Sequence, residues 1–410
     1  PGHPAGAGRH PRRGVGSSTY ESLAMPNPVR WHRAPGLHPA RAAAQEGPAR
    51  GEKAGNRRAR AERDEEDPMA EMRAAFIHKA RDIRLATIPR PEPKDGELLL
   101  RVRTVGVCGS DLHYYREGCV GTQVLTGPQI LGHEFSAEVA DDRGTAHGLP
   151  RGTLVAVDPA RPCGRCEWCL HGHQNLCPDV EFAGSPGRAG GLAEFHTAPP
   201  DALFPVPPHF DAATAAMLEP LGVAIFTLDL AHLRPMENVA VVGAGPIGQL
   251  LIQVARESGA GYIWAIDPID YRVAAAKRAG ADDASTDYTA IERWTGGRGA
   301  DVVLEATNSP TGPETAVACA RVGGRVVMVG IPDGDTFTLS AAAVRGKALT
   351  IKWQKRMGHV YPRAIQMVLA GRIKFDPVMT HRFPLERVPD AFRFQNAYQE
   401  GVLKTMIEVG

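Results

Sequence analysis

Three short motifs between residues 105 and 222 offer side chains that bind metal ions. A thiolate, an imidazole and a carboxylate together suit a catalytic zinc ion, which keeps one coordination position open for substrate. Each residue type has an ordinary structural explanation when it occurs alone, so the prediction rests on their joint occurrence. The candidates are Cys108, Ser110 and His113 in VGVCGSDLHYY, His133 and Glu134 in LGHEF, and Glu219 in LEPLG.

A second, denser pattern consists of cysteines alone. The chain has 7 cysteines, and the stretch RPCGRCEWCLHGHQNLC contains Cys163, Cys166, Cys169 and Cys177. Four thiolates at this spacing are typical of a structural zinc site, which has no open position for substrate. A redox C-x-x-C motif would need a thioredoxin-like βαβ context, which the neighbouring sequence lacks. The sequence therefore predicts a second zinc ion that stabilises this loop.

The remaining thiols limit the ligands of the catalytic zinc ion. Once the clustered cysteines and Cys108 are assigned, only Cys119 and Cys319 remain. We expect Cys119 in a loop and Cys319 on a helix of another domain, so neither is well placed as a ligand. The catalytic site should therefore contain one thiolate, and either Glu134 or Glu219 would supply its carboxylate.

A glycine-rich turn predicts a dinucleotide site. VAVVGAGPIG contains Gly243, Gly245 and Gly248 directly after a predicted strand and at the start of a predicted helix. This spacing allows backbone N–H groups to approach a pyrophosphate at the helix N-terminus. Asp267 ends the next predicted strand, where an acidic residue binds the adenosine ribose hydroxyls and repels a 2′-phosphate. The pattern predicts NAD rather than NADP.

The order of predicted elements divides the chain into four parts. Residues 1–68 are rich in Pro, Gly, Ala and Arg without periodicity, which predicts a disordered or non-native leader. Short strand-like runs between Gly and Pro predict a β-rich domain over residues 69–220. Strands then alternate with helices over residues 221–360, including a helix at GPETAVACARVG, which predicts a Rossmann-type doubly wound parallel sheet. Residues 361–410 should add helices and a closing strand that returns to the first domain. The predicted fold class is α/β with a β-rich domain.

Composition excludes several classes of function. Across 410 residues the formal net charge is +1, which gives no overall attraction to nucleic acid or to an anionic membrane. No apolar run in the sequence approaches the roughly 18 residues of a membrane span. The odd number of cysteines, grouped in C-x-x-C spacing, favours metal binding in a reducing, cytoplasmic setting over disulfide bonds.

Together the motifs resemble those of the zinc-dependent medium-chain alcohol dehydrogenases. CGSDLHYY, GHE, the four-cysteine loop, LEPL and GAGPIG occur in the order found in that superfamily, over about residues 69–410. The similarity is greatest to the polyol branch, the sorbitol (L-iditol) 2-dehydrogenases and xylitol dehydrogenases, on Ser110, Tyr114, Glu134 and Arg356. The resemblance implies a GroES-like catalytic domain, oxidation of a polyol to a ketose with NAD, and a homotetramer.

The resemblance also implies roles for individual residues. Ser110 would take part in proton removal, with His113 relaying the proton to solvent. Glu219 would bind zinc directly or orient its water, and Tyr114 and Arg356 would act at the substrate. The further residues implied to contact NAD are Ile247, Arg272, Val329, Gly330 and Ile331.

Other functions fit parts of the pattern. An L-threonine 3-dehydrogenase or another secondary alcohol dehydrogenase would have the same zinc site, although threonine-specific relatives usually carry Thr at the position of Ser110. A zinc-ribbon binding module would explain the cysteine cluster alone, but it would need a basic face and stacking aromatics. A non-catalytic NAD- or zinc-binding protein would be expected to lose Cys108 or His133, and both are present.

Overall fold

The computed structural model describes residues 70–410, and the leader predicted for residues 1–68 lies outside the described residues. Most strands belong to one largely antiparallel sheet and one parallel sheet. The antiparallel sheet contains β3 (Leu98–Gly106), β7 (Glu134–Val139), β8 (Leu154–Val157), β11 (Phe195–Ala198), β12 (Leu203–Pro205), β19 (Met379–Pro384) and β20 (Lys404–Glu408). The parallel sheet contains β13 (Val239–Val242), β14 (Ile263–Ile266), β15 (Asp283–Ser285), β16 (Ala300–Glu305), β17 (Ala320–Met328) and β18 (Thr350–Trp353). Smaller sheets are formed by β1 (Glu71–Lys79), β2 (Asp82–Pro89) and β6 (Gln129–Ile130), by β4 (Cys119–Val120) and β5 (Gln123–Val124), and by β9 (Ala160–Arg161) and β10 (Glu181–Phe182).

Helices connect and cover these sheets. The α-helices are α1 (Gly109–Glu117), α2 (Glu167–Leu170), α3 (Ala212–Ala216), α4 (Leu218–Ala231), α5 (Pro246–Glu257), α6 (Asp270–Arg278), α7 (Ala290–Thr295), α8 (Gly312–Cys319), α9 (Ala341–Gly346), α10 (Tyr361–Leu369) and α11 (Val388–Asn396). Short 3-10 turns are η1 (Asp142–His147), η2 (Gln174–Leu176), η3 (Pro200–Ala202), η4 (Asp333–Asp335), η5 (Leu385–Arg387) and η6 (Gln399–Gly401).

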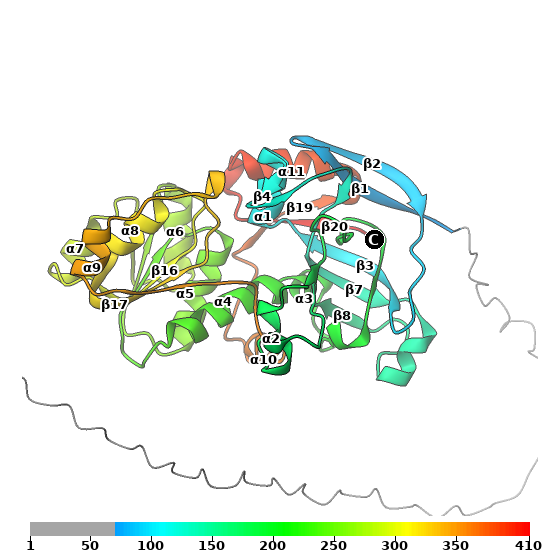
Figure 1. Cartoon of the computed structure of the whole chain (residues 1–410), viewed down its shortest axis with the longest axis horizontal. Helices are drawn as coiled ribbons and strands as arrows, with labels where there is room; N and C mark the ends of the chain where they lie inside the picture. Colours follow the sequence, from blue (N-terminus) through cyan, green and yellow to red (C-terminus); the bar gives the residue numbers. More distant parts are fainter. Residues whose placement is uncertain (1–69) are drawn as a thin grey trace, which may run out of the picture. The chain divides into compact units, whose positions relative to one another are not determined.

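The antiparallel sheet brings the last strands of the chain beside β3. Its strands lie in the order β12-β8-β7-β3-β20-β19, and β11 pairs with β3. β3 can occupy an inner position because most side chains of LLLRVRTVG are buried. β20 pairs antiparallel with β3, with Met406 opposite Gly106. In Figure 1 the red elements α11, β19 and β20 therefore lie beside the blue strands. The C-terminal segment thus belongs to the same half of the molecule as the first strands of the described chain.

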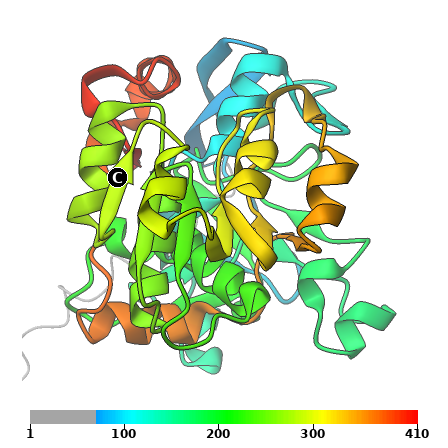
Figure 2. The same ribbon diagram turned by 90° about the vertical axis from the view of Figure 1, so that its left-hand side faces the viewer.

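The parallel sheet has its strands in the order β15-β14-β13-β16-β17-β18, which is the 3-2-1-4-5-6 order of doubly wound nucleotide-binding sheets. Strands such as VAVV in β13 and IWAI in β14 are continuous apolar runs, because helices cover both faces. In Figure 2 the half of the molecule that contains this sheet faces the viewer. Ligands bind such sheets where the strand order reverses, here between the ends of β13 and β16. The predicted α/β fold class is confirmed.

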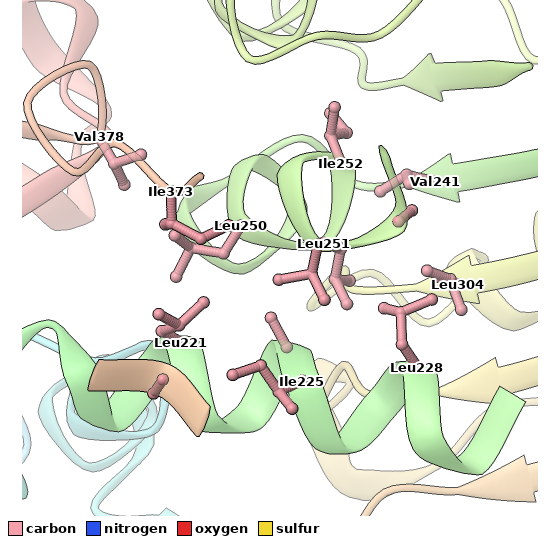
Figure 3. Close-up of a cluster of buried hydrophobic side chains, with 14 of the residues drawn as sticks. Leu221, Ile225, Leu228, Val241, Leu250, Leu251, Ile252, Leu304, Ile373 and Val378 are labelled. Atoms are coloured by element: carbon pink, nitrogen blue, oxygen red, sulfur yellow. The ribbon is translucent and has the colours of Figure 1, made fainter. Parts of the chain in front are cut away.

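Two long helices form the centre of the largest apolar cluster. Figure 3 shows Leu221, Ile225 and Leu228 of α4 on the side that faces Leu250 and Leu251 of α5. All five side chains are buried, and each fully buried aliphatic side chain contributes about 1.5–3 kcal/mol. This packing fixes the start of α4, which carries Glu219, relative to the parallel sheet.

One segment differs from the expectation that no apolar run has the length of a membrane span. Within residues 70–410, the segment Ala212–Ala231, which includes α3 and α4, is the one helix long and apolar enough to cross a membrane. Its most apolar window is 72% buried inside the protein, as expected of a core helix. Thr214, Glu219 and Asp229 interrupt the apolar run in the sequence, although the average over the whole segment remains apolar.

Candidate active site

A cavity of about 860 Å³ is lined by residues from both large sheets and their helices. This volume is within the range of about 300–1,000 Å³ that is typical of small-molecule sites. Cys108 and His133 line it from the half that contains β3, and Gly245 and Ala306 line it from the end of the parallel sheet. The predicted metal ligands and the predicted dinucleotide turn therefore open into one space.

Cys108, His133 and Glu134 come together where α1 and β7 begin. Their ligand atoms all lie within 4.8 Å of one another, and Cys108 is the N-cap residue of α1. Glu134 starts β7 opposite Gly106 of β3. A Cβ atom on Gly106 would lie 2.3 Å from Glu134 Oε2, so this glycine leaves the space that the carboxylate occupies. One thiol, one imidazole and one carboxylate fit the requirements of a catalytic zinc ion.

Glu219 supplies the second candidate carboxylate from the first turn of α4. It lines the same cavity and is buried, but the group of atoms within 4.8 Å is formed with Glu134 instead. Burial raises the pKa of Glu219 to about 8, and the nearby Glu134 adds to the increase. The geometry therefore groups Glu134, and not Glu219, with Cys108 and His133, and burial favours the neutral form of Glu219.

Lys404 is a charged residue of this site that sequence reasoning missed. It lies in β20 with 2% of its surface exposed, and its Nζ is 2.7 and 2.6 Å from the two carboxylate oxygens of Glu134. Burial alone would lower the pKa of Lys404, but Glu134 and Cys108 raise it. The available signal was a lysine in the middle of the largely apolar segment GVLKTMIEV. Because Lys404 neutralises Glu134, a metal ion held by Cys108 and His133 would compete with Lys404 for this carboxylate.

Asp111 is a second residue that the sequence did not single out. Its Oδ1 is 3.6 Å from His133 Nδ1, and its Oδ2 accepts a hydrogen bond of 3.0 Å from the N–H of Cys108. A carboxylate behind a ligating histidine fixes the orientation of the ring. Burial alone would lower the pKa of His133, but Cys108 and Asp111 raise it well above its usual value. The same negative field would attract a metal cation.

Ser110 and His113, the predicted proton-transfer residues, both line the cavity from α1. Ser110 Oγ is 3.4 Å from His133 Nε2, which places its hydroxyl beside the candidate ligands. His113 Nε2 lies 3.0 Å from the carbonyl oxygen of Ile331, in the loop after β17. Burial lowers the pKa of His113, and the positive charge of Arg116 lowers it further. The side chain of His113 is therefore held by the nucleotide half of the cavity.

Tyr114 and Arg356 line the cavity as the resemblance implies for a substrate wall. The hydroxyl of Tyr114 donates to Gln123 Oε1 at 3.3 Å. The guanidinium of Arg356 lies 5.0 Å from the centre of the Phe182 ring, and that ring is 5.1 Å from the ring of His133. Arg356 has a left-handed backbone with φ of 55°, a conformation that costs about 1–3 kcal/mol and persists only where the surroundings enforce it.

The glycine turn after β13 has the close contacts that its sequence predicts. Gly243 has φ of 92°, and a Cβ atom there would lie 2.7 Å from the carbonyl oxygen of Ala306. A Cβ atom on Gly248 would lie 2.0 Å from the carbonyl oxygen of Gly243, so helix and strand pack closely. Gly245 is the N-cap residue of α5. The N–H groups at the start of α5 can therefore approach an anionic ligand.

Asp267 and Arg272 form the far end of the nucleotide side. Asp267 is buried, and its Oδ2 accepts a hydrogen bond of 2.8 Å from the N–H of Ala244 in the glycine turn. Arg272 Nη1 is 3.6 Å from that oxygen, and its guanidinium lies 4.5 Å from the centre of the Tyr398 ring. Asp267 is not among the residues that line the cavity, whereas Arg272 is. The remaining predicted contacts that line it are Ile247, Val329, Gly330 and Ile331.

The four clustered cysteines lie together in a separate lobe. The Sγ atoms of Cys163, Cys166, Cys169 and Cys177 are all within 4.8 Å of one another, and Cys166 Sγ is 3.4 Å from Cys169 Sγ. The backbone N–H of Arg165 is the main cause that lowers the pKa of Cys163 to about 7. Four sulfur donors that face one another fit a closed tetrahedral zinc site.

Family models match both halves of the chain. Residues 94–208 match the alcohol dehydrogenase GroES-like domain, and residues 246–370 match the zinc-binding dehydrogenase domain. The first match contains Cys108, His133 and the cysteine cluster, and the second begins at α5, just after the glycine turn.

Several proteins are similar over almost their whole length. The chain is 33% identical to the sorbitol dehydrogenase of Bacillus subtilis (strain 168) over 344 residues, which are 82% of this chain and 97% of that protein. It is 35% identical to a probable D-xylulose reductase A of Aspergillus clavatus over 318 residues, 74% of this chain and 88% of that protein. The crystal structure of an alcohol dehydrogenase from Escherichia coli CFT073 complexed with NADH has a TM-score of 0.75 and 27% identity, and covers 83% of this chain and 99% of that chain.

Proposed function

The chain belongs to the zinc-dependent medium-chain dehydrogenases, in their polyol branch, and on that basis we propose that it oxidises a secondary hydroxyl of a polyol to a ketone with NAD. Family membership confirms the prediction of an oxidoreductase that uses zinc. The observation that carries the proposal is the single cavity shared by Cys108, His133 and the glycine turn. When bound, NAD would supply the hydride acceptor, and the substrate hydroxyl would give up a proton, so that the products of the proposed reaction would be ketone, NADH and H⁺.

Cys108, His133 and Glu134 would hold the catalytic zinc ion, because their donor atoms are already grouped within 4.8 Å. When bound, this ion supplies Lewis-acid polarisation of the substrate oxygen. Asp111 would keep the ring of His133 in its ligating orientation. Glu219, which lines the same cavity, would orient water or the substrate hydroxyl. The four clustered cysteines would hold a structural zinc ion.

Ser110 and His113 would move the proton. Ser110 Oγ lies beside the imidazole of His133, and would therefore accept the substrate proton close to the metal ligands. His113 would pass the proton on towards solvent, because burial and Arg116 lower its pKa and so favour release of the proton. General acid–base groups of this kind contribute about 10²–10⁴-fold in rate.

Asp267 would select NAD over NADP. Its buried carboxylate accepts a hydrogen bond from the N–H of Ala244. Asp267 is therefore held just after β14, where the adenosine ribose binds in this type of fold. A 2′-phosphate at that position would be repelled by the carboxylate.

The substrate wall would recognise further hydroxyl groups. Tyr114, Gln123 and Arg356 present a phenol, an amide and a guanidinium to the cavity, which can together donate to and accept from a chain of hydroxyls. Relatives named sorbitol dehydrogenase and D-xylulose reductase support a polyol as the substrate class.

A substrate panel tests this proposal. Purified protein is incubated with polyols, L-threonine and simple secondary alcohols, each with NAD or NADP, and formation of reduced nicotinamide is measured. We expect turnover of at least one polyol with NAD, and little with NADP. Turnover of threonine or simple alcohols without any polyol would refute the substrate class, and a preference for NADP would refute the role of Asp267.

We also propose a cytoplasmic homotetramer. β18 is an edge strand of the parallel sheet, and 57% of the surface of its Trp353 is exposed. An open strand edge with a large apolar side chain is suited to pairing with another chain. Light scattering of the purified protein should give four times the mass of the chain, and a monomer would refute this proposal.

A further inference from the structure

A charged network connects α1 to the loop that follows β17. Arg116 Nη2 donates to Asp333 Oδ1 at 2.7 Å, which joins the half with the metal ligands to the nucleotide half. Asn308 Nδ2 donates to the other oxygen of Asp333 at 3.1 Å, and the N–H of Asp333 donates to the carbonyl of Asn308 at 2.8 Å. Asn308 therefore holds the carboxylate of Asp333 in position independently of Arg116.

This ion pair differs from an ordinary surface pair. Only 17% of the side-chain surface of Arg116 is exposed, compared with 42% for Asp333. The second terminal nitrogen of Arg116 is 3.5 Å from Asn396 Oδ1 of α11. A guanidinium held by two neighbours loses little further freedom when it forms the pair, which makes such a pair more favourable than one between mobile side chains.

His113 lies within the same network. Its Nε2 is 3.0 Å from the carbonyl oxygen of Ile331, and its Nδ1 is 3.4 Å from the Asp333 oxygen that Arg116 also contacts. Both ring nitrogens therefore face the loop after β17, and Val329, Gly330 and Ile331 of this loop line the cavity. Any movement of this loop changes where the imidazole lies.

Atoms of His113, Glu117 and Asp333 also lie within 4.8 Å of one another, as in a metal site. However, Arg116 occupies the Asp333 oxygen nearest to the ring, and its positive charge would repel a cation. The cluster is better explained as a network that holds the histidine.

We propose that Arg116 and Asp333 form a clasp between α1 and the loop after β17, beside the cofactor cavity, and that this clasp positions His113 for proton transfer. Both are positioning residues, because they act through the imidazole and not on the substrate. The inference rests on the proposed function, in which His113 releases the proton. Neither residue was identified from the sequence, because they lie 217 positions apart.

The charges around His113 make the clasp measurable. Four groups face the ring: Arg116 and Glu117 from α1, and Asp333 and the carbonyl of Ile331 from the loop. Arg116 lowers the pKa of His113, whereas Asp333 and Glu117 raise it. Removing Arg116 should therefore raise the pKa of His113, and removing the charge of Asp333 should lower it.

The experiment compares Arg116→Met, Asp333→Asn and the double variant with the unchanged chain. Three quantities are measured: kcat and KM against pH, NADH affinity by fluorescence, and the pKa of His113 by NMR with labelled histidine. Arg116→Lys keeps the charge and should retain most activity. Arg382→Met removes an exposed ion pair of 3.0 Å with Glu408 and serves as the matched control.

We expect each single variant to lose about 10-fold or more in kcat/KM for NAD, as for a lost charge-assisted bond. The double variant should lose no more than the worse single variant, because both disrupt one contact. The pKa of His113 should move in opposite directions in the two single variants and return towards its original value in the double variant. Arg382→Met should change none of these quantities.

Three results would overturn the clasp: additive losses in the double variant, shifts of the pKa in one direction only, or activity unchanged in both single variants. Failure of the proposed function is recognised separately. In that case the unchanged chain itself would oxidise no polyol, while the NMR titration and the NADH affinity would still report on the clasp.

Discussion

The buried pair of Glu134 and Lys404 determines how the candidate metal site is charged. Glu134 is the first residue after His133, and so it could be found in the motif GHE. Lys404 could not, because it lies in β20, which pairs with β3, and its contact with Glu134 joins residues 270 positions apart. Asp111 lies in the motif CGSDLHYY, but nothing in the sequence indicates its contact with His133. The ligand types were predictable from spacing, whereas their neighbours depend on strand pairing over long sequence separations.

Replacing Lys404 tests this pair. Lys404→Met leaves the carboxylate of Glu134 buried without its partner, and breaking a buried pair in this way costs about 3–5 kcal/mol. We expect that loss of unfolding free energy in zinc-free protein and a smaller loss in zinc-loaded protein, where the metal replaces the ammonium group. Denaturant titrations of both forms measure it. Adding Glu134→Gln to Lys404→Met should recover part of the loss, and equal losses with and without zinc would contradict the shared role of Glu134.

Replacing Ser110 tests the proton-transfer assignment. Ser110→Ala removes the hydroxyl beside His133, and we expect kcat to fall by about 100-fold while the zinc content stays the same. Ser110→Thr retains a hydroxyl group and is the matched control. Steady-state kinetics with metal analysis provide the measurement, and unchanged turnover in Ser110→Ala would exclude this serine from the proton path.

Asp158 provides a pH-dependent prediction. Burial raises its pKa from 3.8 to about 6, so it stabilises the fold less as pH rises from about 4 through about 6. The loss of unfolding free energy accumulates between about pH 4 and pH 6 and is at most about 3 kcal/mol, from two pKa units at about 1.36 kcal/mol each. Asp158→Asn keeps the oxygen that accepts from the N–H of Ala160 but cannot ionise. Melting curves should show this variant gaining stability relative to the unchanged chain between pH 4 and pH 8, and a constant difference would contradict the assignment.

Secondary-structure elements were predictable where local pattern and packing agree. The strand–glycine–helix unit at Val239–Glu257 follows its sequence closely. The helix expected through GPETAVACARVG instead ends at Cys319, and Ala320 already belongs to β17. Gly323 has φ of 66° and Gly324 follows it, so these two residues do not continue a helix. Pairing of β17 with β16 extends the strand backwards to Ala320.

The cysteine lobe supports the substrate wall as well as its own fold. Asn175, between the third and fourth cysteines, donates to the carbonyl of Lys355 at 3.1 Å. Arg356 follows directly, and Phe182 of β10 lies under its guanidinium. The lobe could be predicted as a zinc site from its spacing, but its contact with the segment of Arg356 could not, because 180 residues separate the two.

Loss of one clustered cysteine should therefore affect substrate binding. In Cys163→Ser we expect loss of one zinc ion per chain, lower thermal stability, and an increase in KM for polyol of about 10-fold with a smaller change in KM for NAD. Asn175→Ala should raise KM for polyol without loss of zinc. Metal analysis and steady-state kinetics measure both variants, and a Cys163→Ser protein with unchanged KM for polyol would separate the lobe from the substrate wall.

At the scale of the whole molecule, the two large sheets place different parts of the candidate site in one shared cavity. The parallel sheet supplies the glycine turn, and the antiparallel sheet supplies the candidate metal ligands. Both parts could be predicted from the sequence, because each depends on a short local motif. The sequence did not predict Arg116 opposite Asp333, since contacts between the halves depend on how they pack.

The central claim is that zinc at Cys108, His133 and Glu134 is required for polyol oxidation by NAD. The most direct test is to measure polyol-dependent NADH formation during stepwise removal of zinc with a chelator, with circular dichroism recorded in parallel. We expect activity to disappear with the first zinc ion removed, while the fold persists, and to return when zinc is added back. Activity that survives complete removal of zinc, or that disappears only as the protein unfolds, would contradict the claim.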